Sequence, residues 1–211
     1  MRAPSLLLAL ESALRTPGIA LLRDGELVAE ITLPPTRPVS EQLLPGIDAL
    51  LTLCGSPLDA VDAFAVSIGP GSFTGIRVGV ATLKGLAFGG AQPVAAVSTL
   101  AALACAAGIP GDTVAAIIDA RRGEVYAGVY ELTEGEPSVT LADGLYTVEE
   151  KIKRGPDRVD IVKLEPQATT APAITGGYML KIDRSDPNEA TFYDPYLQGS
   201  IVYVDPPNEP R

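Results

Sequence analysis

The chain has 211 residues, of which 46% are hydrophobic and 20% are charged, and a formal net charge of −10. This composition is that of a globular protein with enough length for one large domain or two small ones. The acidic balance excludes a protein that holds nucleic acid by itself, because such proteins neutralise phosphates with surplus Lys and Arg.

The first predicted elements are three strands of one antiparallel meander. Residues 6–10 form a short apolar run, and residues 18–22 and 27–31 flank a turn at Asp24-Gly25. The run at 6–10 is too short to span a membrane, and Glu11 interrupts it before any signal-like cleavage site. We therefore expect a cytoplasmic protein with no membrane contact.

Helices and strands alternate in the next part of the chain. Ser40 is the predicted N-cap of a helix that runs to about Cys54, and its regular part is expected to begin nearer Leu44 because Pro45 is unfavourable in a helix interior. Residues 63–68 predict a buried strand, followed by a Gly-rich turn and a helix over about 72–88. A strand at 93–97, a helix at 98–107 and strands at 114–119 and 125–130 complete an α/β pattern.

Two stripes run along the helix predicted at 72–88. Apolar residues recur at heptad-like spacing at Phe73, Ile76, Val80, Leu83 and Ala87. A second stripe consists of Gly71, Gly75 and Gly79. Because a glycine costs about 1 kcal/mol in a helix interior, we expect another backbone to come close to this stripe, and we interpret it as an outward helix–helix contact.

The Gly-rich turn has the chemistry of an anion site. Glycines permit close approach, free N–H groups at a helix start point toward negative charge, and hydroxyls and a guanidinium add donors. The residues of this nucleotide or phosphate hypothesis are Gly69, Gly71, Ser72, Thr74 and Arg77. The alternative is a tight strand-to-helix turn in which Ser72 and Thr74 cap the helix.

The amino-acid sequence of this segment is more specific to one family than its anion-binding chemistry is. Residues 69–79, Gly-Pro-Gly-Ser-Phe-Thr-Gly-Ile-Arg-Val-Gly, closely resemble the signature of the TsaB/YeaZ family. Residues 40–45, 84–87, 97–100 and 119–126 match as well, so that the resemblance covers about residues 5–140. The opening strand departs from the pattern, because it ends in Glu11-Ser12 where Asp-Thr-Ser is more common.

The resemblance implies an actin-like fold of two related lobes. The first lobe is expected over residues 1–108 and the start of an incomplete second lobe over 109–142. The resemblance also implies a non-catalytic relative of TsaD, whose metal is held by a His-x-x-x-His pair, because this sequence contains no histidine. We therefore expect no metal and no catalytic residue, and the same absence excludes Ser-His-Asp catalysis.

The resemblance further implies that the two long helices contact a partner. Half of the apolar residues on these helices are expected to fill the chain's own core. The predicted interface consists of Leu43, Leu44, Ile47, Leu50, Leu51, Gly75, Ile76, Gly79, Val80 and Leu83.

The last part of the chain, residues 143–211, has a different amino-acid composition. Residues 146–161 and 174–184 resemble a fragment of CotH-type spore-coat kinases, too small to supply the elements of a kinase.

The function expected from the resemblance is accessory. The chain would bind and stabilise a TsaD-like subunit that threonylcarbamoylates the adenosine next to the anticodon in tRNA, and it would reach tRNA only through that complex. A TsaE-like ATPase and a second copy of the chain are further candidate partners. No cofactor is expected in the chain alone, with ATP or ADP admitted at a partner interface. The alternative function is a nucleotide-binding phosphotransferase, CotH-like or actin-like.

Overall fold

The computed structural model describes residues 5–121, 124–154, 159–166, 179–183, 190–193 and 200–202. These residues belong to two compact units, 1–99 and 100–211. The lobe boundary predicted after residue 108 thus differs from the unit boundary, which lies at the start of α3. The CotH-like segment, residues 143–211, is described only over the strands within these ranges, and its other residues lie outside the described residues.

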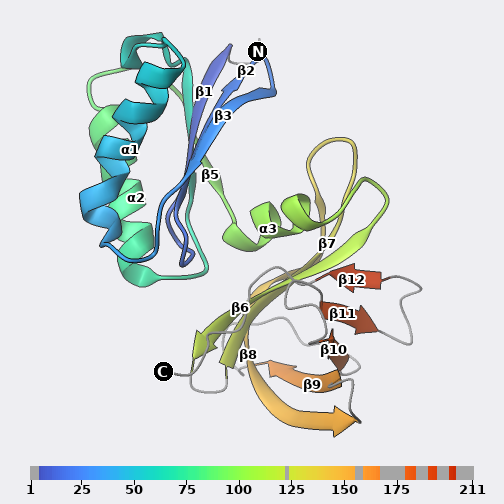
Figure 1. The fold of residues 1–211 in the computed structure, drawn as a ribbon. Helices are drawn as coiled ribbons and strands as arrows, with labels where there is room; N and C mark the ends of the chain where they lie inside the picture. The colour runs from blue at the N-terminus through green and yellow to red at the C-terminus, as the bar shows by residue number, and fades with distance from the viewer. Residues whose placement is uncertain are drawn as a thin grey trace. The chain divides into compact units, whose positions relative to one another are not determined.

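Unit 1 is a five-stranded mixed sheet with two long helices on one face (Figure 1). The strand order is β3-β2-β1-β4-β5, in which β1 pairs antiparallel with β2 and parallel with β4. The elements are β1 (Leu6–Glu11), β2 (Gly18–Arg23), β3 (Glu26–Thr32), α1 (Val39–Leu53), a 3-10 turn (Leu58–Ala60), β4 (Ala63–Ser67), α2 (Phe73–Leu86) and β5 (Val94–Val97). The predicted strands and helices of this unit are therefore confirmed.

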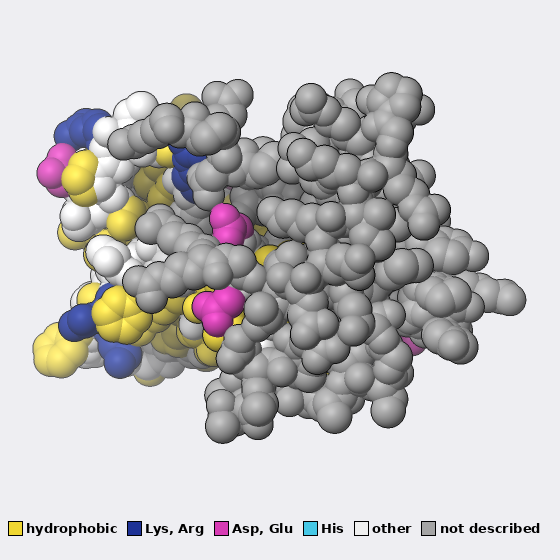
Figure 2. All heavy atoms as spheres, turned by 90° about the horizontal axis from the view of Figure 1, so that it is seen from below, with side chains coloured by type: hydrophobic (Ala, Val, Ile, Leu, Met, Phe, Trp, Pro, Cys, Tyr) yellow, Lys and Arg dark blue, Asp and Glu magenta, His cyan; other side chains and the backbone are white. Residues whose placement is uncertain are grey.

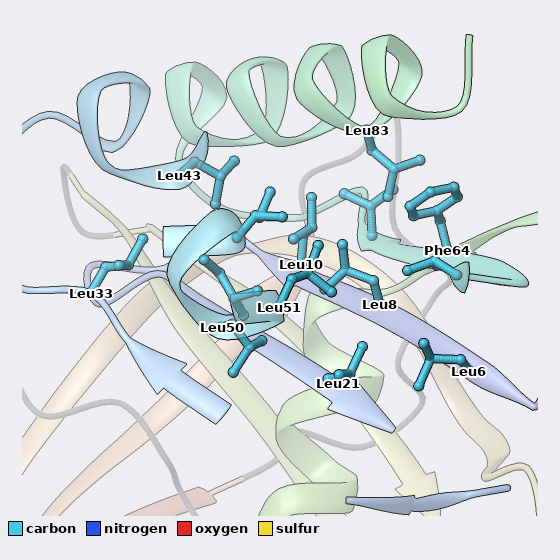
Figure 3. Close-up of a cluster of buried hydrophobic side chains, with 14 residues drawn as sticks. Leu6, Leu8, Leu10, Leu21, Leu33, Leu43, Leu50, Leu51, Phe64 and Leu83 are labelled. Atoms are coloured by element: carbon cyan, nitrogen blue, oxygen red, sulfur yellow. The ribbon is translucent and has the colours of Figure 1, made fainter. Parts of the chain in front are cut away.

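The core of unit 1 lies between the sheet and the two helices (Figure 3). Register places Leu8 of β1 beside Leu21 of β2 on one side and beside Phe64 of β4 on the other. All three side chains are at most 1% exposed. Alternate residues of β1 are buried, as expected of a strand whose one face is covered by helices.

Helix α1 begins earlier than the sequence predicts. Its first residue is Val39, its N-cap is Pro38 without a side-chain hydrogen bond, and Pro45 lies inside it, so the N-cap prediction for Ser40 is wrong. The Gln42 side chain holds the start instead, because Nε2 donates to the carbonyls of Pro34 (3.1 Å) and Arg37 (2.7 Å). Pro45 faces solvent, where water can satisfy the carbonyl that loses its helical partner.

The end of α1 follows from Gly55. The residue has a φ of 59°, which favours glycine. Its N–H donates to the carbonyl of Thr52, and the N–H of Ser56 donates to that of Leu51. These two bonds form a Schellman motif, which stops the helix and redirects the chain toward β4.

Unit 2 consists of α3 and an antiparallel sheet of seven strands in the order β12-β11-β10-β9-β8-β7-β6. The elements are α3 (Thr99–Ala107), β6 (Thr113–Arg121), β7 (Glu124–Glu131), β8 (Ser138–Arg154), β9 (Val159–Pro166), β10 (Met179–Asp183), β11 (Ala190–Tyr193) and β12 (Ser200–Val202). The strands predicted at 114–119 and 125–130 are confirmed as β6 and β7. Strand β8 runs through the predicted boundary at residue 143. No helix among the described residues is long and apolar enough to cross a membrane.

Candidate functional site

The Gly-rich turn joins β4 to α2 and is tied to the turn after β1. Gly69 has a φ of 107° and Gly71 a φ of 149°, conformations in which a side chain would be strained. The N–H of Ser72 donates to the carbonyl of Ala13 (2.7 Å). The Ser72 hydroxyl accepts from the N–H of Gly75 at 3.2 Å, so the expectation that Ser72 caps the helix is confirmed.

Gly69 and Gly71 lie in the same turn as this cap, but the other two predicted anion-site residues, Thr74 and Arg77, are engaged elsewhere or exposed. Thr74 is exposed on the first turn of α2, where the cap hydrogen bond is made by Ser72 instead. The Arg77 guanidinium lies 5.3 Å from the centroid of the Phe73 ring, a cation–π distance. The Arg77 side chain thus contacts an exposed aromatic ring of the helix. Nucleotide binding at this turn stays a prediction.

The glycine stripe faces inward and packs on the turn after β1. A Cβ on Gly75 would lie 1.9 Å from the carbonyl oxygen of Ser12, and a Cβ on Gly79 would lie 2.1 Å from the Ser12 hydroxyl. That hydroxyl also donates to the carbonyl of Gly75 at 2.9 Å. A backbone does approach the stripe, but it belongs to the same chain. The interpretation of Gly75 and Gly79 as an outward partner contact is therefore wrong.

The buried leucine face of the two helices also belongs to the core (Figure 3). Five predicted interface residues are at most 7% exposed, namely Leu43, Ile47, Leu50, Leu51 and Leu83. A side chain buried in its own unit cannot contact a partner, so these five are corrected to core residues. More than the expected half of the predicted set is core. Leu44 is 53% exposed, and Ile76 and Val80 are half-buried.

The outward surface of α1 and α2 carries apolar residues that the sequence prediction omitted from the interface. Leu53 is 76% exposed, Phe73 71% and Phe88 89%. Figure 2 shows hydrophobic side chains beside Lys and Arg side chains on the described part of one face of the molecule. Phe88 is the last residue of the predicted helix and follows Ala87, where the apolar periodicity ends. We call the set Leu44, Leu53, Phe73, Ile76, Val80 and Phe88 the outward face; it groups the apolar residues that α1, α2 and the turn after α2 leave exposed or half-buried, and Leu44 and Leu53 lie on different sides of α1.

Charges on the two helices have opposite sign. Helix α1 exposes Glu41 and Asp48, and α2 exposes Arg77 and Lys84. Glu41 also forms an exposed ion pair with Arg37 at 3.5 Å, which contributes little to stability. On a chain of net charge −10, α2 therefore presents aromatic and basic side chains together.

A carboxylate lies beside the Gly-rich turn, at the end of β1. One oxygen of Glu11 accepts from the N–H groups of Ala13 (2.5 Å) and Leu14 (3.1 Å). Burial raises the pKa of Glu11, and hydrogen bonds from Ser67 and from the two backbone amides partly oppose that shift. The sequence marks Glu11 as the residue that ends the apolar run and as a departure from the family pattern, and neither feature indicates its hydrogen bonds in this turn.

The raised pKa of Glu11 predicts a pH-dependent contribution to stability. The folded chain binds this proton more tightly than the unfolded chain, so the contribution is fully present below the ordinary pKa of 4.5 and is lost as pH rises through the folded-state pKa. We expect the unfolding free energy of the parent to fall relative to Glu11→Gln between pH 4.5 and neutral pH. Urea unfolding at a series of pH values measures this difference, and parallel pH curves would contradict it.

Comparisons with known proteins agree with the resemblance found in the sequence. The family model described as TsaD, tRNA N6-adenosine threonylcarbamoyltransferase, matches residues 26–178, and so extends beyond residue 140. The tRNA threonylcarbamoyladenosine biosynthesis protein TsaB of Bacillus subtilis is 36% identical over 69% of this chain and 66% of its own length. The protein of the same name from Escherichia coli is 39% identical over 61% of this chain and 56% of its own length.

Solved structures give the same result for the fold. YeaZ from Pseudomonas aeruginosa is 36% identical, with a TM-score of 0.61 over 73% of this chain and 74% of that structure. A second Pseudomonas aeruginosa structure, described as similar to peptidase YeaZ, is 38% identical, with a TM-score of 0.64 over 72% of this chain and 71% of that one. The predicted α/β fold is thereby confirmed. The chain spans only about half to two-thirds of the length of the curated relatives, from 51% to 66%.

Proposed function

This chain belongs to the TsaB/YeaZ family, and we propose that it is a non-catalytic accessory subunit for threonylcarbamoylation of the adenosine next to the anticodon in tRNA. In this role it binds and stabilises a TsaD-like catalytic partner. The names of the curated relatives support a place in threonylcarbamoyladenosine biosynthesis. They do not favour the phosphotransferase alternative.

The observation that carries the proposal is the outward face of α1 and α2. Aromatic residues are enriched among the residues that dominate protein–protein binding energy, and Phe73 and Phe88 are both more than two-thirds exposed. Their exposure leaves apolar surface on helices whose opposite sides are already packed in the core. A partner helix would remove that surface from water.

The exposed charges of α1 and α2 support a helical partner that is acidic where it meets α2 and basic where it meets α1. A partner helix against α2 would present acidic groups to Arg77 and Lys84, and one against α1 would present basic groups to Glu41 and Asp48. Such complementarity favours encounter and fixes orientation more than it adds affinity. A second copy of the chain, with α1 of each copy against α2 of the other, would satisfy the same pattern, so homodimerisation is the competing arrangement.

The lack of a catalytic role is supported by the amino-acid composition of the chain. The chain contains no histidine, so it cannot supply the His pair on which TsaD-like metal binding depends. Its net charge of −10 favours contact with tRNA only through the complex. A role in tRNA modification supports a cytoplasmic location for the chain. A TsaE-like ATPase is a second proposed partner, and ATP or ADP is proposed only at an interface between subunits.

The proposal predicts that acidic substitutions on the outward face weaken complex formation. A Phe73→Asp/Phe88→Asp double variant should bind a TsaD-like subunit at least about tenfold more weakly, since truncation of a central interface aromatic typically costs about 2 kcal/mol or more. Co-purification, followed by sizing and a titration of affinity, measures the change. Both positions are exposed, so the variant should remain folded.

Leu27→Asp is the matched control for this experiment. Leu27 is 57% exposed but lies on the edge strand β3, away from the outward face. The Leu27→Asp variant should therefore form the complex as the parent does. A double variant that binds as tightly as the parent would contradict the assigned surface. A folded parent that forms no complex would contradict the accessory function itself. Sizing of the parent alone distinguishes a homodimer on the same face.

A further inference from the structure

Strand β5 leaves one edge of the unit 1 sheet open. It is the last strand in the order β3-β2-β1-β4-β5, and in the described part of the chain its strand neighbour is β4 (Figure 1). Val94, Ala95 and Ala96 are exposed, with Val94 at 48%. An open edge of this kind presents backbone N–H and C=O groups that can pair with a further strand.

The hydrogen bonds to β4 show which backbone groups of β5 point outward. The carbonyls of Pro93 and Val97 both accept backbone N–H groups from the β4 side, at 2.9 Å. Along a strand, the N–H and C=O groups of one residue point to one side and those of the next residue to the other. The N–H and C=O groups of Val94 and Ala96 therefore point away from β4.

The two edges of this sheet differ in charge. The opposite edge strand, β3, exposes Glu26 and Glu30, and charged side chains on an edge oppose pairing with another strand. Residues 85–111, which include β5, contain no Asp, Glu, Lys or Arg. Two copies of a chain of net charge −10 repel one another. Strand β5 is an edge at which they can meet without bringing like charges together.

We propose that β5 is a contact between two copies of this chain, in which the two β5 strands pair antiparallel and join the two sheets. The outward groups are complementary to themselves in this arrangement. When Ala95 of each copy lies at the two-fold axis, Val94 of one copy lies opposite Ala96 of the other. Both residues have outward N–H and C=O groups, so each pair can exchange both bonds of a hydrogen-bonded antiparallel pair. The small side chain of Ala95 suits the central pair, where antiparallel strands approach most closely.

This contact is separate from the outward face of α1 and α2, and it does not depend on the proposed accessory function. The two contacts have opposite salt dependence. Salt screens the repulsion between two acidic copies, so the β5 dimer should tighten as ionic strength rises. A contact through the charged helices should weaken, because salt screens its favourable ion pairs.

The test is sedimentation equilibrium of the full chain at protein concentrations up to about 1 mM. The parent should form dimers in this range. Ala95→Glu, at an exposed position, places like charges opposite each other at the two-fold axis. Ala96→Pro removes an outward N–H and leaves the bonds to β4 in place. Each variant should dimerise at least about tenfold more weakly than the parent.

Leu27→Glu is the matched control, because it adds the same charge to the other edge strand at a residue that is 57% exposed. Its dimer should be nearly as tight as that of the parent. Hydrogen exchange gives a second measurement on the parent alone. The amide protons of Val94 and Ala96 should exchange more slowly as the protein concentration rises, because pairing removes them from water.

Three results would overturn the proposal. The first is a parent that stays monomeric up to about 1 mM, and the second is a dimer that Ala95→Glu and Leu27→Glu weaken equally. The third is a dimer that Phe73→Asp/Phe88→Asp abolishes and Ala95→Glu leaves intact, which would assign the contact to the outward face. If Ala96→Pro does not fold, Ala95→Glu and the exchange of the parent still decide.

Discussion

Gly75→Ala is expected to destabilise unit 1 by about 3 kcal/mol, although alanine is the better helix former. The new Cβ would lie 1.9 Å from the Ser12 carbonyl oxygen, which is backbone and cannot rotate away. The turn that carries Ser12 is also fixed by the bond from Ser72 to Ala13. Relief of the clash would move α2 off the sheet and break the bond from the Ser12 hydroxyl to the Gly75 carbonyl.

Gly85→Ala is the control on the same helix. A Cβ at Gly85 meets nothing within 4 Å, so only the helix propensity changes, and we expect stabilisation of up to about 1 kcal/mol. Urea unfolding of both variants, followed by circular dichroism, gives the two free energies. Equal changes in both would contradict the close approach of Ser12 to α2.

Leu50→Ala is expected to cost about 3 kcal/mol of unfolding free energy, within the range of about 2–5 kcal/mol for buried leucines. Leu50 is 0% exposed and belongs to the cluster between α1 and the sheet. The substitution removes apolar contacts and leaves a cavity that the surrounding β-strands and helices can only partly close. Its location in the core, rather than on a partner surface, makes the loss measurable in the isolated chain.

Leu53→Ala provides the comparison one turn further along α1. Leu53 is 76% exposed, so its truncation should change the unfolding free energy by no more than about 0.5 kcal/mol. Its effect should appear instead in the affinity for a partner. A large loss of stability in Leu53→Ala, or none in Leu50→Ala, would contradict the assignment of the two helix faces.

Local sequence signals predicted most elements of unit 1 because its strands are short apolar runs bounded by turn residues. The Asp24-Gly25 turn is an example, since both residues have positive φ values of 53° and 87°, as a two-residue hairpin requires. The start of α1 was missed because a local side-chain contact outside the usual capping patterns decides it. Gln42 anchors the first turn to the preceding loop, and no capping residue in the sequence signals that bond.

The candidate site was predictable in its composition but not in its orientation. Spacing showed that Gly75 and Gly79 share a face of α2, and their cost implied a close neighbour. The neighbour was identified only by the fold, which brings Ser12 from 63 positions away in the sequence. Sequence spacing likewise does not show which of the adjacent residues Leu43 and Leu44 is buried. Leu43 is 1% exposed and Leu44 is 53% exposed.

The strand order of unit 1 has a consequence for its synthesis. Strand β1 is made first but occupies the middle of the sheet, between β2 and β4. The meander of β1, β2 and β3 can form soon after it leaves the ribosome, since its contacts are local. Its second neighbour, β4, begins only at Ala63, so one edge of β1 and the buried row around Leu8 stay uncovered over that interval. The nascent chain therefore passes through a stage with an open strand edge beside apolar side chains, the kind of surface that chaperones bind and that promotes aggregation.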